Sequence, residues 1–304
     1  MKIIYNTPEH DVARVYVAEL TDGSRIEFVE STQPPYSKEE KLIIIVSTLK
    51  GCPINCSFCD AGGYYNGRLT YQQILDQIYY VINNNYKDNV PKTKKLKIQF
   101  ARMGEPAFNP DVLRVLEELP NIYDSDILMP SISTIAPRRC ETFFDSLIQI
   151  KKGKYPNGKF QLQFSIHTTD EILKRKLIPA DTWDLEEIAS YGERFWTTGD
   201  RKITLNFATP VGYPIEAEKL LEHFNPEKYL IKLTPVNPTK KVETNKLCST
   251  IDPDNPQRNK AICYSLEKHG YDVILSIGEL EENNIGSNCG MYIDKRTSSS
   301  IILQ

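Results

Sequence analysis

Three cysteines spaced C-x₃-C-x₂-C are the side chains in this sequence best suited to metal chemistry. Cys52, Cys56 and Cys59 lie in the segment GCPINCSFCD, directly after the apolar run at residues 42–46. Three thiolates this close together can hold one corner of a metal centre and leave one metal position without a protein ligand. An iron–sulfur cube with such an open iron can bind a small molecule. The segment therefore predicts a [4Fe–4S] cluster with room for a ligand.

Two simpler interpretations of the cysteine segment agree less well with the sequence. Structural zinc takes four ligands, usually two C-x₂-C pairs or a cysteine pair with a histidine pair. No second pair lies near the segment, and the four histidines are scattered along the chain. A ferredoxin-type electron carrier needs a fourth cysteine, commonly followed by proline.

Composition limits the remaining function classes. The 304 residues are 40% hydrophobic and 25% charged, with a formal net charge of −3. This allows a full core in one barrel-sized α/β domain and gives no overall positive charge for nucleic acid or membranes. The sequence has no apolar stretch of membrane-spanning length and no signal-peptide pattern at its start. Seven cysteines with three in one metal-ligand segment, and a cluster that oxygen would damage, favour a cytoplasmic protein without a disulfide framework.

The first 40 residues predict a β-hairpin extension. Residues 14–20 and 25–29 alternate between polar and apolar side chains, and Asp22-Gly23 between them is a strong turn signal. Residues 41–304 then predict one domain with a C-terminal tail.

From residue 41 onward, short β-rich runs alternate with helical patterns. Strands are expected at residues 42–49, 96–101, 127–134, 160–167, 203–208 and 230–236, and helices at 70–85, 110–119, 138–152, 185–197, 215–224 and 257–269. A last strand is expected at residues 271–277. Repeated βα units predict parallel strands with right-handed crossovers. Six units are too few for a closed eight-stranded barrel, so the expected fold is a partial (β/α)₆ TIM-like barrel of the α/β class.

Motifs recur where the predicted strands end, which is where such barrels carry their chemistry. The cysteine segment follows the first strand, RMGEP follows the second, SIST ends the third, SIH ends the fourth and PVNP ends the sixth. The basic runs at residues 92–97 and 151–154 precede strands and should lie at the opposite end. We interpret those runs as a solvated face rather than an RNA-binding surface.

As an ordered set, these motifs resemble one subgroup of the radical S-adenosylmethionine (radical SAM) superfamily, the ribosomal-RNA adenine methyl synthases and their antibiotic-resistance relatives. The resemblance runs from about Arg14 to Asp294 and includes LxxKLIP at residues 173–179 and IGSNCG at residues 285–290. It implies a [4Fe–4S] cluster and S-adenosyl-L-methionine as cofactors. It also implies reductive cleavage of that cofactor to a 5′-deoxyadenosyl radical, with an external electron donor of the flavodoxin or ferredoxin type.

The resemblance assigns roles to individual residues. The cluster ligands are Cys52, Cys56 and Cys59. The residues expected to contact the methionine part of the cofactor are Gly104, Glu105 and Ser133. Those expected along its ribose and adenine are Phe58, Ser165, Ile166, His167 and Asn237. The alternative interpretations are a strand-end cap for Glu105 and a satisfied rim histidine for His167. Glu27 lies near the place of a family acid/base glutamate.

Cys289 agrees with the pattern of the family, whereas Ile45 departs from it. In the family, the cysteine at the place of Cys289 carries a methyl group, and a second cysteine, seven residues before the first cluster cysteine, resolves the thioether by forming a disulfide. Ile45 occupies that second place here, and an alkyl group cannot act as a thiol. Cys248, an external thiol or a different chemistry would have to replace it, since Cys140 and Cys263 fall in predicted helices as packing residues. Cys289 as a buried small hydrophobe is the alternative.

The expected substrate also departs from the family. RNA-modifying relatives carry a helical RNA-recognition domain ahead of the hairpin, whereas 13 residues precede Arg14 here. We therefore place a small molecule, nucleotide or peptide ahead of RNA as the substrate, with no membrane partner.

Three functional hypotheses follow. The first is a methyl synthase, a methyltransferase-like enzyme with Cys289 as methyl carrier. The second is an enzyme whose radical abstracts hydrogen directly from substrate, with Cys289 as donor or anchor. The third is a non-catalytic, cluster-bearing binding or sensing protein.

Overall fold

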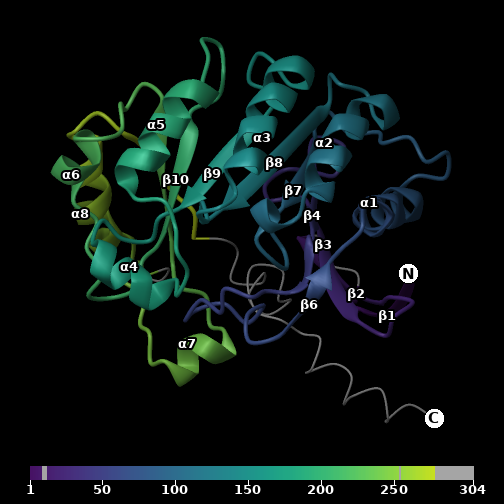
Figure 1. The fold of residues 1–304 in the computed structure, drawn as a ribbon, viewed down its shortest axis with the longest axis horizontal. Coiled ribbons are helices and arrows are strands. Elements are labelled where there is room, and N and C mark those ends of the chain that lie inside the picture. The colour runs from purple at the N-terminus through teal and green to yellow at the C-terminus, as the bar shows by residue number, and fades with distance from the viewer. Residues whose placement is uncertain (9–11, 253–254, 278–304) are drawn as a thin grey trace. The chain divides into compact units, whose positions relative to one another are not determined.

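The computed structural model describes residues 1–8, 12–252 and 255–277 (Figure 1). These residues form two compact units. The first contains residues 1–8, 12–55 and 59–132, and the second contains residues 56–58, 133–252 and 255–277. The cysteine segment is therefore shared, because Cys56 belongs to the second unit while Cys52 and Cys59 belong to the first.

The first unit is built on strands paired in the order β1-β2-β3-β4-β7-β8. Neighbours from β1 to β4 are antiparallel, and β4, β7 and β8 are parallel. The bounds are β1 Lys2–Asn6, β2 Ala13–Glu19, β3 Arg25–Ser31, β4 Leu42–Val46, β7 Leu96–Phe100 and β8 Leu128–Thr134. The predicted hairpin is confirmed as β2 and β3, and β3 continues into the sheet by pairing with β4.

Two helices and a small ribbon complete the first unit. Helix α1 (Tyr71–Asn85) begins with a capping box formed by Thr70 and Gln73, and it packs against β4 and α2 (Asp111–Ile122) (Figure 1). Strands β5 (Leu49–Gly51) and β6 (Tyr65–Arg68) pair antiparallel on either side of the cysteine segment. This ribbon fixes where the segment leaves the sheet and where it returns.

The second unit is built on four parallel strands in the order β9-β10-β11-β12. The strand bounds are β9 Gln161–Ser165, β10 Ile203–Ala208, β11 Tyr229–Thr234 and β12 Asp272–Leu275. The helix bounds are α3 Glu141–Lys154, α4 Glu171–Leu177, α5 Leu185–Phe195, α6 Ala217–Leu221, α7 Lys240–Thr244 and α8 Pro256–Glu267. Helix α8 packs against β12.

Alternation along the parallel strands of each unit gives one face that is apolar and one that differs in composition. In β10, Ile203, Leu205 and Phe207 are almost completely buried on one face, and Thr204, Asn206 and Ala208 alternate with them on the other. In β4, Leu42, Ile44 and Val46 form the apolar face, which leaves Ile43 and Ile45 on the other.

The prediction of an α/β fold with a mostly parallel sheet is confirmed. All six predicted strands and all six predicted helices are present, with shifted ends. The first strand ends at Val46 rather than residue 49, and the helix expected at 215–224 is only Ala217–Leu221. Strand β1, the β5–β6 ribbon and helices α4 and α7 were not predicted. Within the described part of the chain, no helix is both long and apolar enough to cross a membrane.

Candidate functional site

The ends of the cysteine segment are shaped by backbone contacts within the first unit. The amide of Cys52 donates to the carbonyl of Tyr64 at 3.0 Å, and the amide of Gly62 donates to the carbonyl of Cys59 at 3.3 Å. Gly51 has φ +80°, and a Cβ there would lie 2.2 Å from the Tyr64 carbonyl oxygen. Only glycine permits this approach, so the segment begins in one defined conformation.

The segment after β7 is held beside the cysteine segment. The amides of Thr48 and Leu49 both donate to the carbonyl of Met103, at 2.9 and 3.1 Å. Burial raises the pKa of the Cys52 thiol, and the nearby Glu105 carboxylate raises it further. Glu105 and Cys52 are therefore neighbours, as expected of residues that follow the adjacent parallel strands β7 and β4.

Glu105 and Gly104 have clear structural roles in this arrangement. Glu105 is 4% exposed, and its carboxylate accepts from the amide of Ala107 at 3.0 Å, capping a short 3₁₀ helix at Pro106–Phe108. Gly104 has φ +91°, and a Cβ there would lie 2.4 Å from the side chain of Leu49. The cap considered from sequence for Glu105 is thus present, and its contact with a cofactor stays a prediction.

The middle of the cysteine segment belongs to the second unit. The amide of Ser57 donates to the carbonyl of Leu177 at 2.9 Å, at the end of α4. The ring of Phe58 meets the imidazole of His167 edge-on, with centroids 4.8 Å apart. The structure therefore brings together two residues that the sequence assigned to the same cofactor region.

His167 is a buried, neutral histidine. It is 4% exposed and has φ +66°, and its Nδ1 accepts from the amide of Ala208 at 2.9 Å. Burial, with a smaller effect from the positive charge of Lys174, lowers the pKa of His167 to about 3. Because Nδ1 is an acceptor in this contact, the proton of the neutral ring is on Nε2.

The other residues assigned to the cofactor lie at or after strand ends in the second unit. Ser133 Oγ accepts from Gln163 Nε2 at 3.3 Å. Ile166 is completely buried, and its amide donates to the carbonyl of Asn206 at 2.9 Å. Asn237 is partly exposed, and its carbonyl accepts from the amide of Thr239 at 2.8 Å.

Two polar residues that were missed from sequence, Asn206 and Lys232, form a row with the predicted Ser165 across three strands of the second unit. Ser165, Asn206 and Lys232 are register partners on β9, β10 and β11. Partners in adjacent parallel strands direct their side chains to the same face, so the three residues share the more polar face. The alternation of apolar and polar residues in β10 was the available signal for Asn206, but no terminal motif marks that strand.

Ile45, on β4, and Glu27, on β3, both lie in the first unit. Ile45 is in register with Gln99 on β7 and packs against a buried cluster of Val12, Ala13, Val15 and Val29. Glu27 is fully buried and paired with Arg102 at 2.7 Å. The charge of the Glu27 carboxylate is therefore compensated within the protein.

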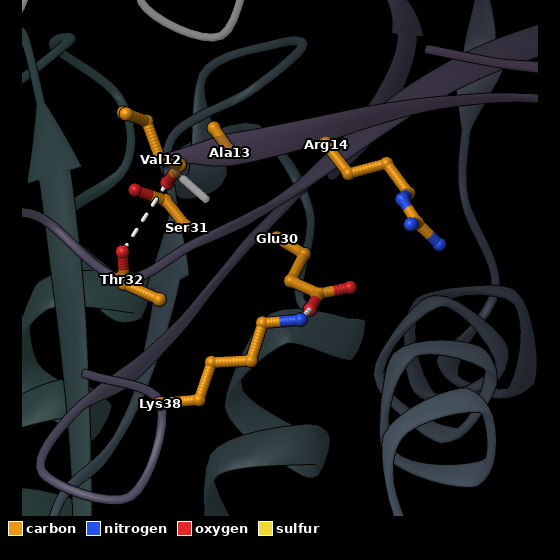
Figure 2. A pocket seen from close by; sticks show the side chains of 7 residues that line it. All are labelled: Val12, Ala13, Arg14, Glu30, Ser31, Thr32 and Lys38. Carbon is orange, nitrogen blue, oxygen red and sulfur yellow. Dashed lines mark hydrogen bonds and ion pairs between the residues drawn. The ribbon is translucent and has the colours of Figure 1, made fainter. Parts of the chain in front are cut away.

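A shallow hollow of about 210 Å³, including its open mouth, lies on the hairpin. Its lining residues are Val12, Ala13, Arg14, Glu30, Ser31, Thr32 and Lys38. Figure 2 shows the Lys38 ammonium against the Glu30 carboxylate, a contact of 2.7 Å. Tyr16 also donates to Glu30 at 2.8 Å. Because Glu30 is already engaged by both groups, we assign no chemistry to this hollow.

The cysteine segment fits a [4Fe–4S] cluster by its donors. Cys52, Cys56 and Cys59 are partly buried thiols on a loop whose two ends and middle are each held by backbone contacts. In the described ranges, no three histidine, cysteine or acidic side chains converge as a preformed metal site. The fit therefore rests on the soft thiol donors and the shape of their loop. Cys289 lies outside the described residues.

The fold is similar to that of two solved structures. A radical SAM methyltransferase from Sphaerobacter thermophilus matches 95% of this chain and 80% of its own, with a TM-score of 0.69 and 19% identity. Streptococcus suis SuiB bound to S-adenosylmethionine matches 79% of this chain and 51% of its own, with a TM-score of 0.53 and 16% identity. At these levels of sequence identity, the two comparisons show the fold of this chain.

The chain is also similar in sequence to curated proteins that are described as RNA methyltransferases. "Probable dual-specificity RNA methyltransferase RlmN" of Nostoc punctiforme is 27% identical over 254 residues, which are 79% of this chain and 64% of that protein. The protein with the same description from Heliobacterium modesticaldum is 24% identical over 294 residues, 92% of this chain and 71% of its own length. The chain thus spans less than two thirds of the Nostoc protein. No family model matches it.

Proposed function

We propose that this protein is a radical SAM enzyme of the methyltransferase-like kind, with Cys52, Cys56 and Cys59 as ligands of a [4Fe–4S] cluster and Cys289 as methyl carrier. The observation that carries the proposal is the position of Glu105 beside Cys52, where two neighbouring parallel strands end. The described relatives of the chain are RNA methyltransferases by name, which supports the transferase class. When bound, the cluster and S-adenosylmethionine would supply a 5′-deoxyadenosyl radical.

The residues of the chain would bind and orient the cofactor. The Glu105 carboxylate and the strand-end carbonyl of Gly104 suit an ammonium group, and Ser133 suits the carboxylate beside it. The neutral His167 offers an Nε2–H donor, and Phe58 offers an aromatic face. The remaining residues proposed along ribose and adenine are Ser165, Ile166 and Asn237. We add Asn206 and Lys232 to the proposed cofactor-binding residues, because they share a face with Ser165.

A second candidate function is hydrogen abstraction directly from substrate, with Cys289 as hydrogen donor or anchor. Ile45 favours it, because an aliphatic side chain packed against Val15 and Val29 stands at the place of the family's resolving cysteine. Under the first function, Cys248, which is exposed, or an external thiol would have to resolve the thioether.

The proposed partners follow from the chemistry. The cluster needs an external one-electron donor of the flavodoxin or ferredoxin type, and its sensitivity to oxygen supports a cytoplasmic location. The net charge of −3 favours a small molecule, nucleotide or peptide over RNA as the substrate. RNA is the competing substrate class, because the relatives are RNA methyltransferases by name.

The test is anaerobic reconstitution followed by reaction with dithionite and S-adenosylmethionine. 5′-Deoxyadenosine is measured by mass spectrometry, along with the mass of the peptide that contains Cys289. Formation of 5′-deoxyadenosine together with a methylated Cys289 supports the first function. Formation of 5′-deoxyadenosine while Cys289 stays unmodified supports the second. A fully loaded protein that forms no 5′-deoxyadenosine overturns both and favours the binding or sensing hypothesis.

A further inference from the structure

Helix α7 makes three contacts with the middle of the cysteine segment. Five residues are too few for a stable helix by themselves, and Val242 is its one buried residue. Its capping residues and its first turn nevertheless reach three consecutive backbone carbonyls. The donors are Thr239 to Phe58 at 2.9 Å, Asn245 to Ser57 at 2.6 Å, and Lys241 to Cys56 at 3.4 Å.

Thr239 couples the start of α7 to the segment. Its hydroxyl accepts from the amide of Val242 at 3.1 Å, as an N-cap, and donates to the carbonyl of Phe58. Thr239 is 2% exposed, and its hydrogen bond from Val242 is buried. One hydroxyl therefore stabilises the helix and fixes Phe58 at the same time.

Asn245 contacts the cysteine segment from the other end of α7. It is the C-cap residue, and its side-chain amide donates to the carbonyl of Ser57. The amide of Ser57 donates in turn to the carbonyl of Leu177. The backbone on both sides of Ser57 is thus fixed by segments far away in sequence, and such long-range contacts do not arise from local turn geometry.

Lys241 adds a positive charge beside Cys56. Its ammonium lies 3.4 Å from the carbonyl oxygen of this cluster ligand. An iron–sulfur cluster held by three thiolates becomes more negative when it accepts an electron. A nearby cation stabilises the reduced state more than the oxidised state and so raises the reduction potential.

We infer that α7 is a clamp, meaning that its hydrogen bonds hold the backbone of Cys56–Phe58 in place, and that the positive charge of Lys241 raises the reduction potential of the cluster. The statement about the potential rests on the proposed function, whereas the clamp is a property of the chain itself. The two parts are therefore tested separately.

The clamp is tested by hydrogen–deuterium exchange on the cluster-free protein. Thr239→Val removes the donor to Phe58 together with the N-cap acceptor, and Asn245→Asp removes only the donor to Ser57. The amides of Cys56–Cys59 should exchange about fivefold faster or more, since fivefold is the effect of losing one hydrogen bond. Thr244→Val is the matched control, because Thr244 donates only to Lys240 within α7. If Thr239→Val does not fold, the exposed Asn245 carries the test. Wild-type exchange rates in the folded variants overturn the clamp.

The electrostatic part is tested by redox titration of the reconstituted protein. Lys241→Gln should lower the midpoint potential, Lys241→Arg should restore it, and Lys240→Gln, the same charge change at the neighbouring exposed lysine, should leave it unchanged. Equal potentials in wild type and Lys241→Gln overturn the role of Lys241. A wild type that binds no iron and sulfide overturns the proposed function together with this role, while the exchange experiment still decides the clamp.

Discussion

The ring of Phe58 contacts the imidazole of His167 edge-on, with the two planes inclined by 73°. This contact joins the middle of the cysteine segment to the segment that follows β9. Because Nδ1 of His167 accepts from the amide of Ala208, the imidazole has one fixed orientation. The position of Phe58 beside the proposed cluster ligand Cys59 is thus set by a neutral histidine whose own position is set by β10.

The buried neutral state of His167 predicts a pH-dependent stability. The pKa of His167 is about 3 in the folded protein against 6.5 for an unperturbed histidine. The unfolded chain therefore binds the extra proton between these values, and this contribution to stability is complete above pH 6.5 and is lost as the pH falls toward 3. The loss approaches about 1.4 kcal/mol per pH unit.

His167→Asn keeps an acceptor for the Ala208 amide and removes the titration. Urea unfolding between pH 6.5 and 5 should give this variant a shallower loss of stability than wild type, with parallel curves above pH 7. Identical slopes in the acid range would contradict a buried neutral imidazole.

Gly104→Ala should destabilise the first unit through its contact with Leu49. Alanine at φ +91° costs roughly 1–2 kcal/mol, and its Cβ would lie 2.4 Å from the Leu49 side chain. Gly23→Ala is the control, since Gly23 has a similar φ of +78° and nothing within 4 Å of the added Cβ. Urea unfolding should give a clearly larger loss for Gly104→Ala. Equal losses would show that backbone strain alone is responsible.

Glu27→Gln should be strongly destabilising, because it leaves the charge of Arg102 buried without its counter-ion. The two side chains are 0% and 4% exposed, and breaking such a pair costs about 3–5 kcal/mol. Glu193→Gln, in the exposed pair with Lys228, should cost less than about 1 kcal/mol. Thermal and urea unfolding measure both variants. A small effect at Glu27 would show that the pair contributes little to the fold, which would leave it available for acid/base chemistry.

Cys56→Ala should abolish both the charge-transfer absorption of the cluster and the formation of 5′-deoxyadenosine, because the two remaining thiolates would leave two of the four irons without a protein ligand. Cys263→Ala, at a partly buried position in α8, should retain both. Iron and sulfide analysis of anaerobically purified protein is the direct measurement. Zinc in place of iron and sulfide would refute the assignment.

The elements of the fold could largely be predicted from sequence because their signals are local. The turn at Asp22-Gly23 and the alternation in β10 each depend on neighbours within a few residues, and the predicted bounds of β10 match the structure. The three cysteines were found in the same way, since ligand spacing is a property of one short segment.

The environment of the site depends on contacts that no local pattern contains. Helix α7 was not predicted, because its stabilising contacts are with Cys56–Phe58, 181 to 188 residues earlier in the chain. The row of Ser165, Asn206 and Lys232 exists only once strand register is set. Sequence therefore determined which groups could perform the chemistry. Only the tertiary structure determined which side chains hold them, because burial, pairing and hydrogen bonding between distant segments follow from packing of the whole chain.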